Sequence, residues 1–375
     1  MTKNWRRAAV CLQLAAVLAA AAGCRQEESL FKGGSGSGSG HEQSLSAGSK
    51  AELNQAAFTV LAEKLRVPWG IQFHGDTIYI SEREGNIVAV QDMQMTRLPV
   101  KLSKAVFAQG EGGFLGLVLA PDFASSGQAY AYHTYRENGN VLNRVVLLKK
   151  QGDSWSEAGA LLEDIPGSVT HNGGRLAIGP DRQLYITTGD AGKEQLAQDL
   201  SSTAGKILRM TLDGQIPADN PFPNSLVYSY GHRNPQGLAW NSKGALYSSE
   251  HGPSGTPGGH DEMNRIEPGK NYGWPVIIGD QEHPDMVKPL YHSGETAIAP
   301  SGITFAGDSK LLVSALRGQR LFMLDTDTHK LTAVLEKGGR LRDVQIHEGR
   351  TYVITNNTDG RGTPSEQDDR LLLLK

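Results

Sequence analysis

The feature that most constrains the fold is a short pattern that recurs six times between about residue 56 and the C-terminus. Each copy begins with a glycine and a few apolar residues, passes through a turn, and ends in a β-rich run. The copies start at residues 69, 115, 176, 237, 302 and 344. Their spacing, very roughly 40–65 residues, matches one four-stranded sheet per repeat. The pattern predicts an all-β fold, a six-bladed β-propeller.

The alternation of residues within the repeats supports strands rather than helices. Apolar and polar residues alternate in Thr77-Ile78-Tyr79-Ile80. No long stretch of this region repeats its apolar residues with the period of about 3.6 residues that an amphipathic helix requires. Two packed β-sandwiches are the alternative architecture, but the chain has no linker-like break in its middle. In a propeller, the loops that enter successive blades converge on the mouth of one central channel. Functional residues should therefore recur at the same position of several repeats.

Composition excludes some classes of function. The chain has 375 residues, 38% of them hydrophobic, which is ample for one large core. Its formal net charge is only -3, so nothing indicates a nucleic-acid partner or broad electrostatic binding to membranes. The only cysteines are Cys11 and Cys24. The folded part therefore has no disulfide, no thiolate nucleophile and no cysteine metal site.

The N-terminus is typical of an export signal, which we place at residues 1–24. A basic start precedes an apolar stretch from Ala8 to Ala22, shorter than the roughly 20 residues of a membrane-spanning helix. Ala21-Ala22-Gly23-Cys24 resembles a bacterial lipobox, although leucine is the usual first residue of that motif. The motif predicts lipidation of Cys24, and an ordinary secretory signal is the alternative.

The segment that follows the signal, residues 25–55, is predicted to be a flexible tether because it contains an unbroken Gly/Ser run at 33–40. The propeller then occupies residues 56–375. A lipid anchor followed by a tether predicts a protein exported and attached to the outer face of a bacterial membrane, or else secreted.

His171 is the first candidate for chemistry. It opens the sequence His-Asn-Gly-Gly-Arg-Leu immediately before the third repeat, where paired glycines leave space beside it. An imidazole titrates near neutrality and can take a proton from a substrate hydroxyl. The alternative is a loop histidine that bonds the backbone.

Two further motifs place cations at repeat entries. Residues 231–237 read Gly-His-Arg-Asn-Pro-Gln-Gly and precede the fourth repeat. Arg233 can stabilise developing negative charge, or it can simply tie two loops together. Arg340 and Arg342 precede the sixth repeat, and residues at i and i+2 of an extended segment project to the same side.

These segments together resemble the soluble glucose and aldose sugar dehydrogenases that use pyrroloquinoline quinone (PQQ), a family of six-bladed propellers. The resemblance extends from about Val67 to Lys375. It implies that His171 is the general base. It also implies that Arg233 stabilises negative charge on the quinone as hydride arrives.

The resemblance also implies a set of cofactor contacts. Arg340 and Arg342, with Arg317 where relatives offer lysine, are suited to the three carboxylates of PQQ. Asn234 and His251 are expected beside the cofactor as well, His251 standing where relatives can carry glutamine. Paired cations at this end of the chain thus predict the PQQ site.

Calcium is the second cofactor that the resemblance implies. The carbonyls of Gly252 and Pro253 are expected to hold a Ca²⁺ that contacts PQQ, and Glu262 and Tyr272 match positions of a structural Ca²⁺ site. A rival interpretation is a transition-metal site formed by four residues within twelve positions, His251, His260, Asp261 and Glu262.

The predicted activity is oxidation of an aldose at its anomeric carbon. His171 removes the hydroxyl proton, hydride passes from C1 to PQQ, the product is a lactone, and electrons leave to an external acceptor. Glu111 falls where the family places a polar substrate contact. The short stretch at 274–300 lacks the aromatic residues of glucose-specific members, which favours a broader aldose enzyme.

Two other function classes are compatible with a propeller. One is a non-catalytic propeller that binds a carbohydrate or a protein at the same mouth. The other is a Ca²⁺-dependent hydrolase of lactones or esters. Such hydrolases usually bring several carboxylate and asparagine side chains to the metal, whereas the motifs here are rich in arginine and histidine.

Overall fold

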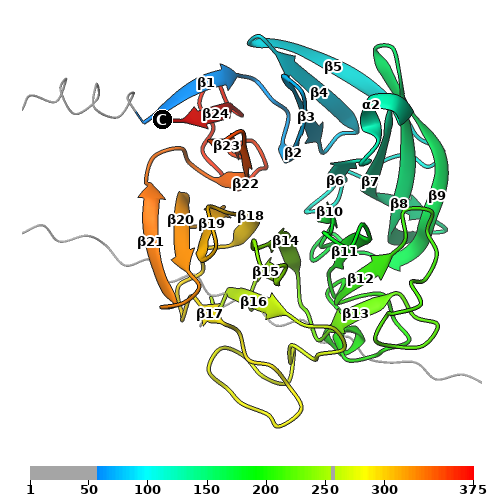
Figure 1. Ribbon diagram of the computed structural model, residues 1–375, viewed down its shortest axis with the longest axis vertical. Helices are drawn as coiled ribbons and strands as arrows, with labels where there is room; N and C mark the ends of the chain where they lie inside the picture. Colours follow the sequence, from blue (N-terminus) through cyan, green and yellow to red (C-terminus); the bar gives the residue numbers. More distant parts are fainter. Residues whose placement is uncertain (1–56, 255–257) are drawn as a thin grey trace, which may run out of the picture. The chain divides into compact units, whose positions relative to one another are not determined.

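The computed structural model describes residues 57–254 and 258–375, which form a ring of antiparallel sheets around a central axis (Figure 1). The predicted signal, the tether and Cys24 lie outside the described residues. Within those residues, no helix has the length and apolar character needed to cross a membrane. The only helices described are the short α2 (Phe123–Ser126) and the 3-10 helix η1 (Glu194–Ala197).

The ring consists of six blades of four antiparallel strands, as the repeats predict. The outer strands of the first two blades also pair in parallel, Val100 with Trp155 and Lys101 with Ser156, so that these two blades form one eight-stranded sheet. The first three blades are β2 (Pro68–His74), β3 (Thr77–Glu82), β4 (Asn86–Gln91) and β5 (Gln94–Lys101); β6 (Phe114–Leu119), β7 (Gln128–Glu137), β8 (Asn140–Gln151) and β9 (Ser154–Pro166); and β10 (Leu176–Ile178), β11 (Leu184–Thr188), β12 (Lys206–Met210) and β13 (Val227–Tyr230). The next two are β14 (Pro235–Trp240), β15 (Leu246–Glu250), β16 (Glu262–Ile266) and β17 (Tyr291–His292); and β18 (Pro300–Phe305), β19 (Lys310–Ala315), β20 (Arg320–Asp325) and β21 (Lys330–Leu335).

The last blade joins both ends of the described chain. It contains β22 (Leu341–His347), β23 (Arg350–Thr355), β24 (Leu371–Leu374) and, as its outer strand, β1 (Phe58–Ala62). Phe58 pairs with Leu374, so the first strand of the ring closes the sheet made by the last three. The repeat pattern does not reveal this closure, because β1 lies before the first copy.

The repeated glycines allow the innermost strands to approach one another. Five innermost strands carry a β-bulge near their start, and a glycine lies at or beside most of these bulges. A Cβ on Gly237 would lie 2.4 Å from the Ser301 carbonyl, and one on Gly302 only 1.8 Å from the Asp343 carboxylate. Larger residues would push neighbouring blades apart around the axis.

Apolar side chains fill the spaces between adjacent blades. One cluster joins Tyr185 of β11 to Leu238 and Leu246 of the next blade, and another joins Tyr79 of β3 to Phe114 of β6. Because each blade buries one face against each neighbour, the ring is rigid and its loops are held in place. Most of the polar residues discussed below lie on those loops or at the strand ends that they join.

Candidate active site

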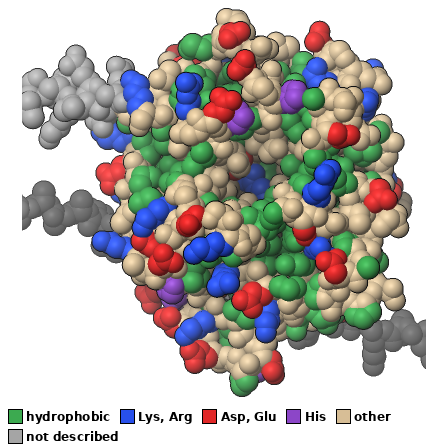
Figure 2. Space-filling model, viewed as in Figure 1, with side chains coloured by type: hydrophobic (Ala, Val, Ile, Leu, Met, Phe, Trp, Pro, Cys, Tyr) green, Lys and Arg blue, Asp and Glu red, His purple; other side chains and the backbone are tan. Residues whose placement is uncertain are grey.

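A cavity of about 340 Å³ lies at the end of the ring where the chain enters the innermost strands. Its lining includes residues from loops of several blades, namely Glu111, His171, Arg233, His251, Arg317 and Arg340. Figure 2 shows a face of the ring that is hollowed at its centre, with basic side chains in and around the hollow. The repeats thus bring together residues that are far apart in the sequence, as expected.

His171 lies at the cavity wall with its ring oriented by a carboxylate. Its Nδ1 is 2.7 Å from Oδ1 of Asp190, and the other oxygen of Asp190 accepts a hydrogen bond of 2.9 Å from the indole of Trp274. Because a carboxylate only accepts, Nδ1 carries the proton and Nε2 is the nitrogen able to accept one. The side chain of His171 is 17% exposed, whereas that of Asp190 is 2% exposed.

The loop that carries His171 packs closely against the segment that contains Gly189. His171 has φ of 54°, in the left-handed region, and a Cβ on Gly189 would lie only 1.9 Å from its carbonyl oxygen. The glycine before Asp190 is therefore required for the carboxylate to reach the imidazole.

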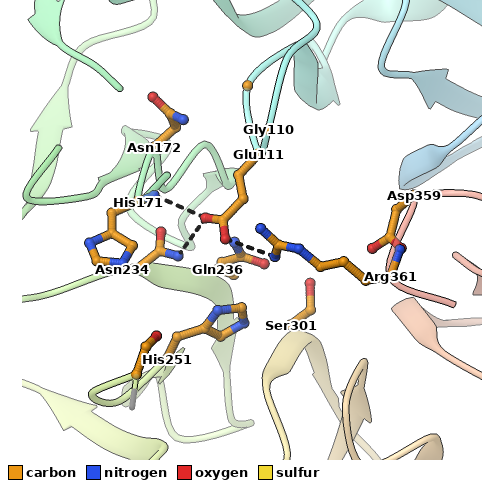
Figure 3. Close-up of polar contacts among 12 residues, drawn as sticks. Gly110, Glu111, His171, Asn172, Asn234, Gln236, His251, Ser301, Asp359 and Arg361 are labelled. Carbon is orange, nitrogen blue, oxygen red and sulfur yellow. Dashed lines mark hydrogen bonds and ion pairs between the residues drawn. The ribbon is translucent and has the colours of Figure 1, made fainter. Parts of the chain in front are cut away.

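Glu111 is held at the centre of the cavity by three donors (Figure 3). Its Oε2 accepts from the backbone of His171 at 2.9 Å and from the amide of Asn234 at 3.3 Å, and its Oε1 accepts from Arg361 at 2.9 Å. Burial raises the pKa of Glu111, but His251 in its protonated form, the His171 N–H and Arg361 lower it by more, so that the pKa falls to about 2. Glu111 is therefore ionised at neutral pH.

Arg233 is buried beside the same cavity. A hydrogen bond from its backbone N–H to Glu250 fixes its loop, and its guanidinium lies 5.2 Å from the ring centroid of Trp274. Nη1 donates to the carbonyl of His251 at 3.3 Å, while Nε is buried with no partner among the described residues. Burial lowers the pKa of Arg233, and the nearby Asp190 and other carboxylates partly offset this effect.

Arg340 and Arg317 supply two more cations to the cavity. Arg340 precedes β22 and donates to Asp359 at 2.7 Å, and its Nε is buried without a partner in the described part of the chain. Arg317 is exposed in the turn between β19 and β20, where it has no ion pair with any described residue.

Arg342 and Asn234 lie behind the cavity lining. Arg342 occupies the bulge of β22, so it does not project beside Arg340 as two residues of a regular strand would. It lies deeper in the channel, where Nη1 donates to the Gln236 side chain at 2.7 Å and burial lowers its pKa to about 9. Asn234 is fully buried behind Glu111 and accepts from the Gly173 N–H at 3.0 Å.

The channel below the cavity is closed by a packed layer of side chains. Arg175 lies 4.1 Å from the ring centroid of Trp69 and donates to the backbone of Gln236 at 2.8 Å. Arg342 is also near the ring of Trp69, at 5.9 Å, and within 3.5 Å of the Ser301 hydroxyl. These residues lie at or beside the entries of different innermost strands, and together they support the residues of the cavity wall.

The loop after β15 contributes backbone groups. The N–H of Gly252 donates to Asp261 at 2.9 Å, and the carbonyl of Pro253 accepts from Gly259 at 3.2 Å. The Gly252 carbonyl accepts no hydrogen bond within the described residues. Burial lowers the pKa of His251 to about 4, so its ring is neutral, and its Nε2 is buried without a partner in those residues.

Glu262 and Tyr272, expected at a structural Ca²⁺, lie in the fourth blade and not among the described lining of the cavity. Glu262 pairs in register with Glu250, and burial first, then Glu250 and Asp261, raise its pKa to about 8. The Tyr272 hydroxyl is already engaged, since it donates to the Arg265 carbonyl at 2.6 Å. Only the backbone of Tyr272 is left for a metal.

The transition-metal interpretation finds no support in the structure. Across residues 57–254 and 258–375, no three His, Cys, Asp or Glu side chains gather as a metal site requires. Asp261 instead accepts from the backbone of Gly252 and of Ile298, and His260 packs on His292 with 5.3 Å between ring centroids.

The family model for glucose/sorbosone dehydrogenases matches residues 65–372, which span nearly the whole ring. The chain belongs to this family. The aldose sugar dehydrogenase YliI of Escherichia coli K12 is 31% identical over 80% of this chain and 90% of its own length.

Solved structures of glucose/sorbosone dehydrogenase relatives share the fold. A putative glucose dehydrogenase of Thermus thermophilus is 41% identical, with a TM-score of 0.78 over 85% of this chain and 99% of the other. The PQQ-bound aldose sugar dehydrogenase of Streptomyces coelicolor is 38% identical, with a TM-score of 0.77 over 85% of this chain and 97% of the other. The expected family and the six-bladed propeller are confirmed.

The sequence motifs do not reveal several residues of the candidate site. Asp190, which orients His171, follows the second strand of its blade, and Glu250 ends the second strand of the next blade. The shared position of these two carboxylates is a signal that a comparison of repeats could detect. Arg361 lies in the loop between β23 and β24, and no motif of the repeats points to it.

Proposed function

We propose that this protein oxidises the anomeric carbon of an aldose to the lactone with bound PQQ and Ca²⁺. The observation that carries the proposal is the pairing of His171 with Asp190 at a cavity whose wall also contains Arg233, Arg317 and Arg340. A positioned base and a cationic wall are what removal of a proton and a hydride from one carbon requires.

The charges of the cavity fit PQQ. Four guanidiniums line the cavity, those of Arg233, Arg317, Arg340 and Arg361. Arg233 and Arg340 each have a buried Nε without a partner among the described residues. The lining carboxylates are already engaged, Glu111 by Arg361 and Asp261 by backbone N–H groups. A ligand with three carboxylates would find free donors here and little repulsion. PQQ, when bound, would supply the two-electron acceptor for the hydride.

A Ca²⁺ beside the cofactor fits the loop after β15. The Gly252 and Pro253 carbonyls are the expected ligands, and the Gly252 carbonyl has no competing donor within the described residues. Oxygen ligands of this kind suit a hard cation. The proposed role of the cation is to add positive charge beside Arg233.

The protein's own residues would handle the substrate proton. Nε2 of His171 takes the proton of the C1 hydroxyl, while Asp190 keeps the ring oriented and stabilises the imidazolium that forms. Glu111, ionised and held in place, can accept a hydrogen bond from a sugar hydroxyl. Loss of the hydroxyl proton and the C1 hydride leaves a lactone, and the two electrons then leave to an external acceptor.

The cellular setting is part of the same proposal and rests on the sequence. Export by residues 1–24 and lipidation of Cys24 would place the propeller at the outer face of a bacterial membrane. There it would meet external sugars, and the membrane contact would be through the lipid alone.

Reconstitution of the full-length protein tests the proposal. Protein stripped of metal receives Ca²⁺, PQQ, both or neither, and reduction of a dye is followed with a panel of aldoses. We expect sugar-dependent reduction only when both are present, with several aldoses oxidised at comparable rates. No reduction, together with no PQQ-induced rise in melting temperature, would favour the non-catalytic propeller. Lactone hydrolysis without PQQ would favour the hydrolase.

A further inference from the structure

A second cavity of about 450 Å³ lies beside the active-site cavity, and we call it the rim cavity. It is bounded by the loop between β21 and β22 and by the loop between β23 and β24. Arg340 and Arg361 line both cavities. A ligand that extends from the active-site cavity along these two arginines therefore reaches the rim cavity.

The rim cavity carries an excess of positive charge, because its cations outnumber the carboxylates that pair with them. Its described lining contains four cationic side chains, those of Lys337, Arg340, Arg361 and Arg370, against one carboxylate, that of Asp368. Three of these cations have a carboxylate partner: Arg370 pairs with Asp368 at 3.1 Å, Arg340 with Asp359 at 2.7 Å, and Arg361 with Glu111 at 2.9 Å. Lys337 is exposed and forms no ion pair with any described residue. The electrostatic potential in this cavity is therefore positive, and it attracts anions.

Donor groups remain free on the paired arginines. Arg340 uses Nη2 for Asp359, and Arg361 uses Nη1 for Glu111, so each guanidinium has further N–H groups. A guanidinium carries five donors in a planar fork that matches an oxyanion. The rim cavity can therefore form charge-assisted hydrogen bonds beyond those that hold the loops together.

Glycines keep the rim cavity open. Gly339 has φ of 75°, and a Cβ there would lie 2.3 Å from the side-chain oxygen of Asn357. A Cβ on Gly362 would lie 2.5 Å from the carbonyl of the same residue. Both loops pack so closely against Asn357 that only glycine fits at these two positions. No side chain extends from them into the space between the cations.

We propose that the rim cavity binds an anionic group of a saccharide whose reducing end occupies the active-site cavity. This inference rests on the proposed function, and it narrows the substrate class to aldoses that carry a carboxylate or a phosphate away from C1. When the reducing end is bound in the active-site cavity, the oxyanion of the same molecule is held near the rim cavity at a high effective concentration, which strengthens its binding there. Neutral aldoses are still oxidised, with a higher KM.

Direct binding provides the first test. Calorimetry on the full-length protein compares trigalacturonic acid with maltotriose, a neutral sugar of equal length, without PQQ. We expect tighter binding of the acid, and a loss of about tenfold in its affinity for Lys337→Glu. Lys243→Glu, an exposed lysine in the turn between β14 and β15, is the matched control and should change nothing. Equal affinity of wild type for both sugars overturns the proposal.

Kinetics with Ca²⁺, PQQ and a cationic dye provide the second test. Lys337→Glu should raise the KM for trigalacturonic acid with kcat for maltotriose unchanged, and Arg370→Gln should act in the same direction. Glucose 6-phosphate against glucose distinguishes a phosphate preference from a carboxylate preference. Equal losses with charged and neutral sugars, or weakened PQQ binding, would assign these cations to the fold or the cofactor and overturn the proposal.

The two proposals fail separately. If no aldose is oxidised but Lys337→Glu still abolishes the preference for trigalacturonic acid in calorimetry, the anion site stands and the dehydrogenase assignment fails. If neutral aldoses are oxidised and no preference for charged ones exists, the assignment stands and the rim cavity has no role in substrate binding. Raising the salt concentration should remove the preference, since screening acts on exposed charges.

Discussion

Two histidine–carboxylate pairs lie at the same edge of adjacent blades, and they have different environments. In the third blade, His171 precedes β10 and its Nδ1 lies 2.7 Å from Asp190, just after β11. In the fourth blade, His232 precedes β14 and its Nδ1 lies 2.9 Å from Glu250, at the end of β15. Both blades thus place a histidine before the innermost strand beside a carboxylate at the end of the second strand.

The environments of the two imidazoles decide what each can do. The His171 side chain is 17% exposed at the cavity, whereas that of His232 is fully buried. Nε2 of His232 is bonded to Ser229 at 2.8 Å, and its ring stacks on Tyr272. A histidine with both nitrogens engaged cannot take a proton from a substrate. Burial therefore separates a candidate base from a structural histidine when both lie at the same edge of adjacent blades.

The largest expected effect comes from replacing the two histidines in parallel. His171→Asn should lower kcat about 10²- to 10⁴-fold, because a positioned base is lost, with stability and PQQ binding nearly unchanged. His232→Asn should instead lower the free energy of unfolding by about 2–4 kcal/mol, since Glu250 loses its buried partner. Dye reduction and urea unfolding of both variants separate the effects. Full activity in His171→Asn would remove the assigned base.

Replacing the carboxylate of each pair tests the same difference, with a smaller expected effect on kcat. Asp190→Asn replaces a carboxylate that accepts from both His171 and Trp274 with a neutral amide that has one acceptor oxygen. The imidazolium loses its charge partner, so kcat should fall about 10²-fold while the fold persists. Glu250→Gln, the matched change in the next blade, should act mainly on stability because Glu250 also holds the Arg233 backbone. If Asp190→Asn affects unfolding alone, both pairs are structural and the proposed mechanism is wrong.

The fold was predictable because its determinants are local and repeated. Alternating strands and the glycine at each blade entry follow from short-range sterics, and six copies of one pattern leave few architectures. The closure by β1 was not predictable in this way, since its partner Leu374 lies at the opposite end of the chain. Such a contact is set by the geometry of the whole ring.

The site was predictable to the extent that it follows the repeat. His171, Arg233 and Arg340 lie before innermost strands, and the structure brings all three to one cavity. The bulge that moves Arg342 into the channel depends on packing against neighbouring strands, so regular strand geometry misplaces it. Arg361 reaches Glu111 across 250 positions of sequence, and no local pattern specifies that contact.

The smallest expected effect concerns Glu111, which holds the backbone of His171 but has no counterpart in the His232 pair. Its pKa of about 2 lies below the ordinary value of 4.5, because the donors around it outweigh burial. A carboxyl whose pKa is depressed by folding contributes stability above its unfolded pKa, and that stability is lost as pH falls through the folded pKa. The contribution should therefore disappear between about pH 5 and pH 2.

Urea unfolding across this pH window checks the prediction. In wild type, the free energy of unfolding should fall as pH decreases from about 5, with about 1–2 kcal/mol of the loss due to Glu111 after allowance for its partial exposure. Glu111→Gln should show a correspondingly shallower dependence, whereas Glu348→Gln, at an exposed carboxylate, should retain the wild-type slope. Identical slopes in all three proteins would mean that the bonds from Arg361, Asn234 and His171 do not stabilise the ionised form. The loop of His171 would then depend on Asp190 alone, and the two histidine pairs would be held in more similar ways than the structure indicates.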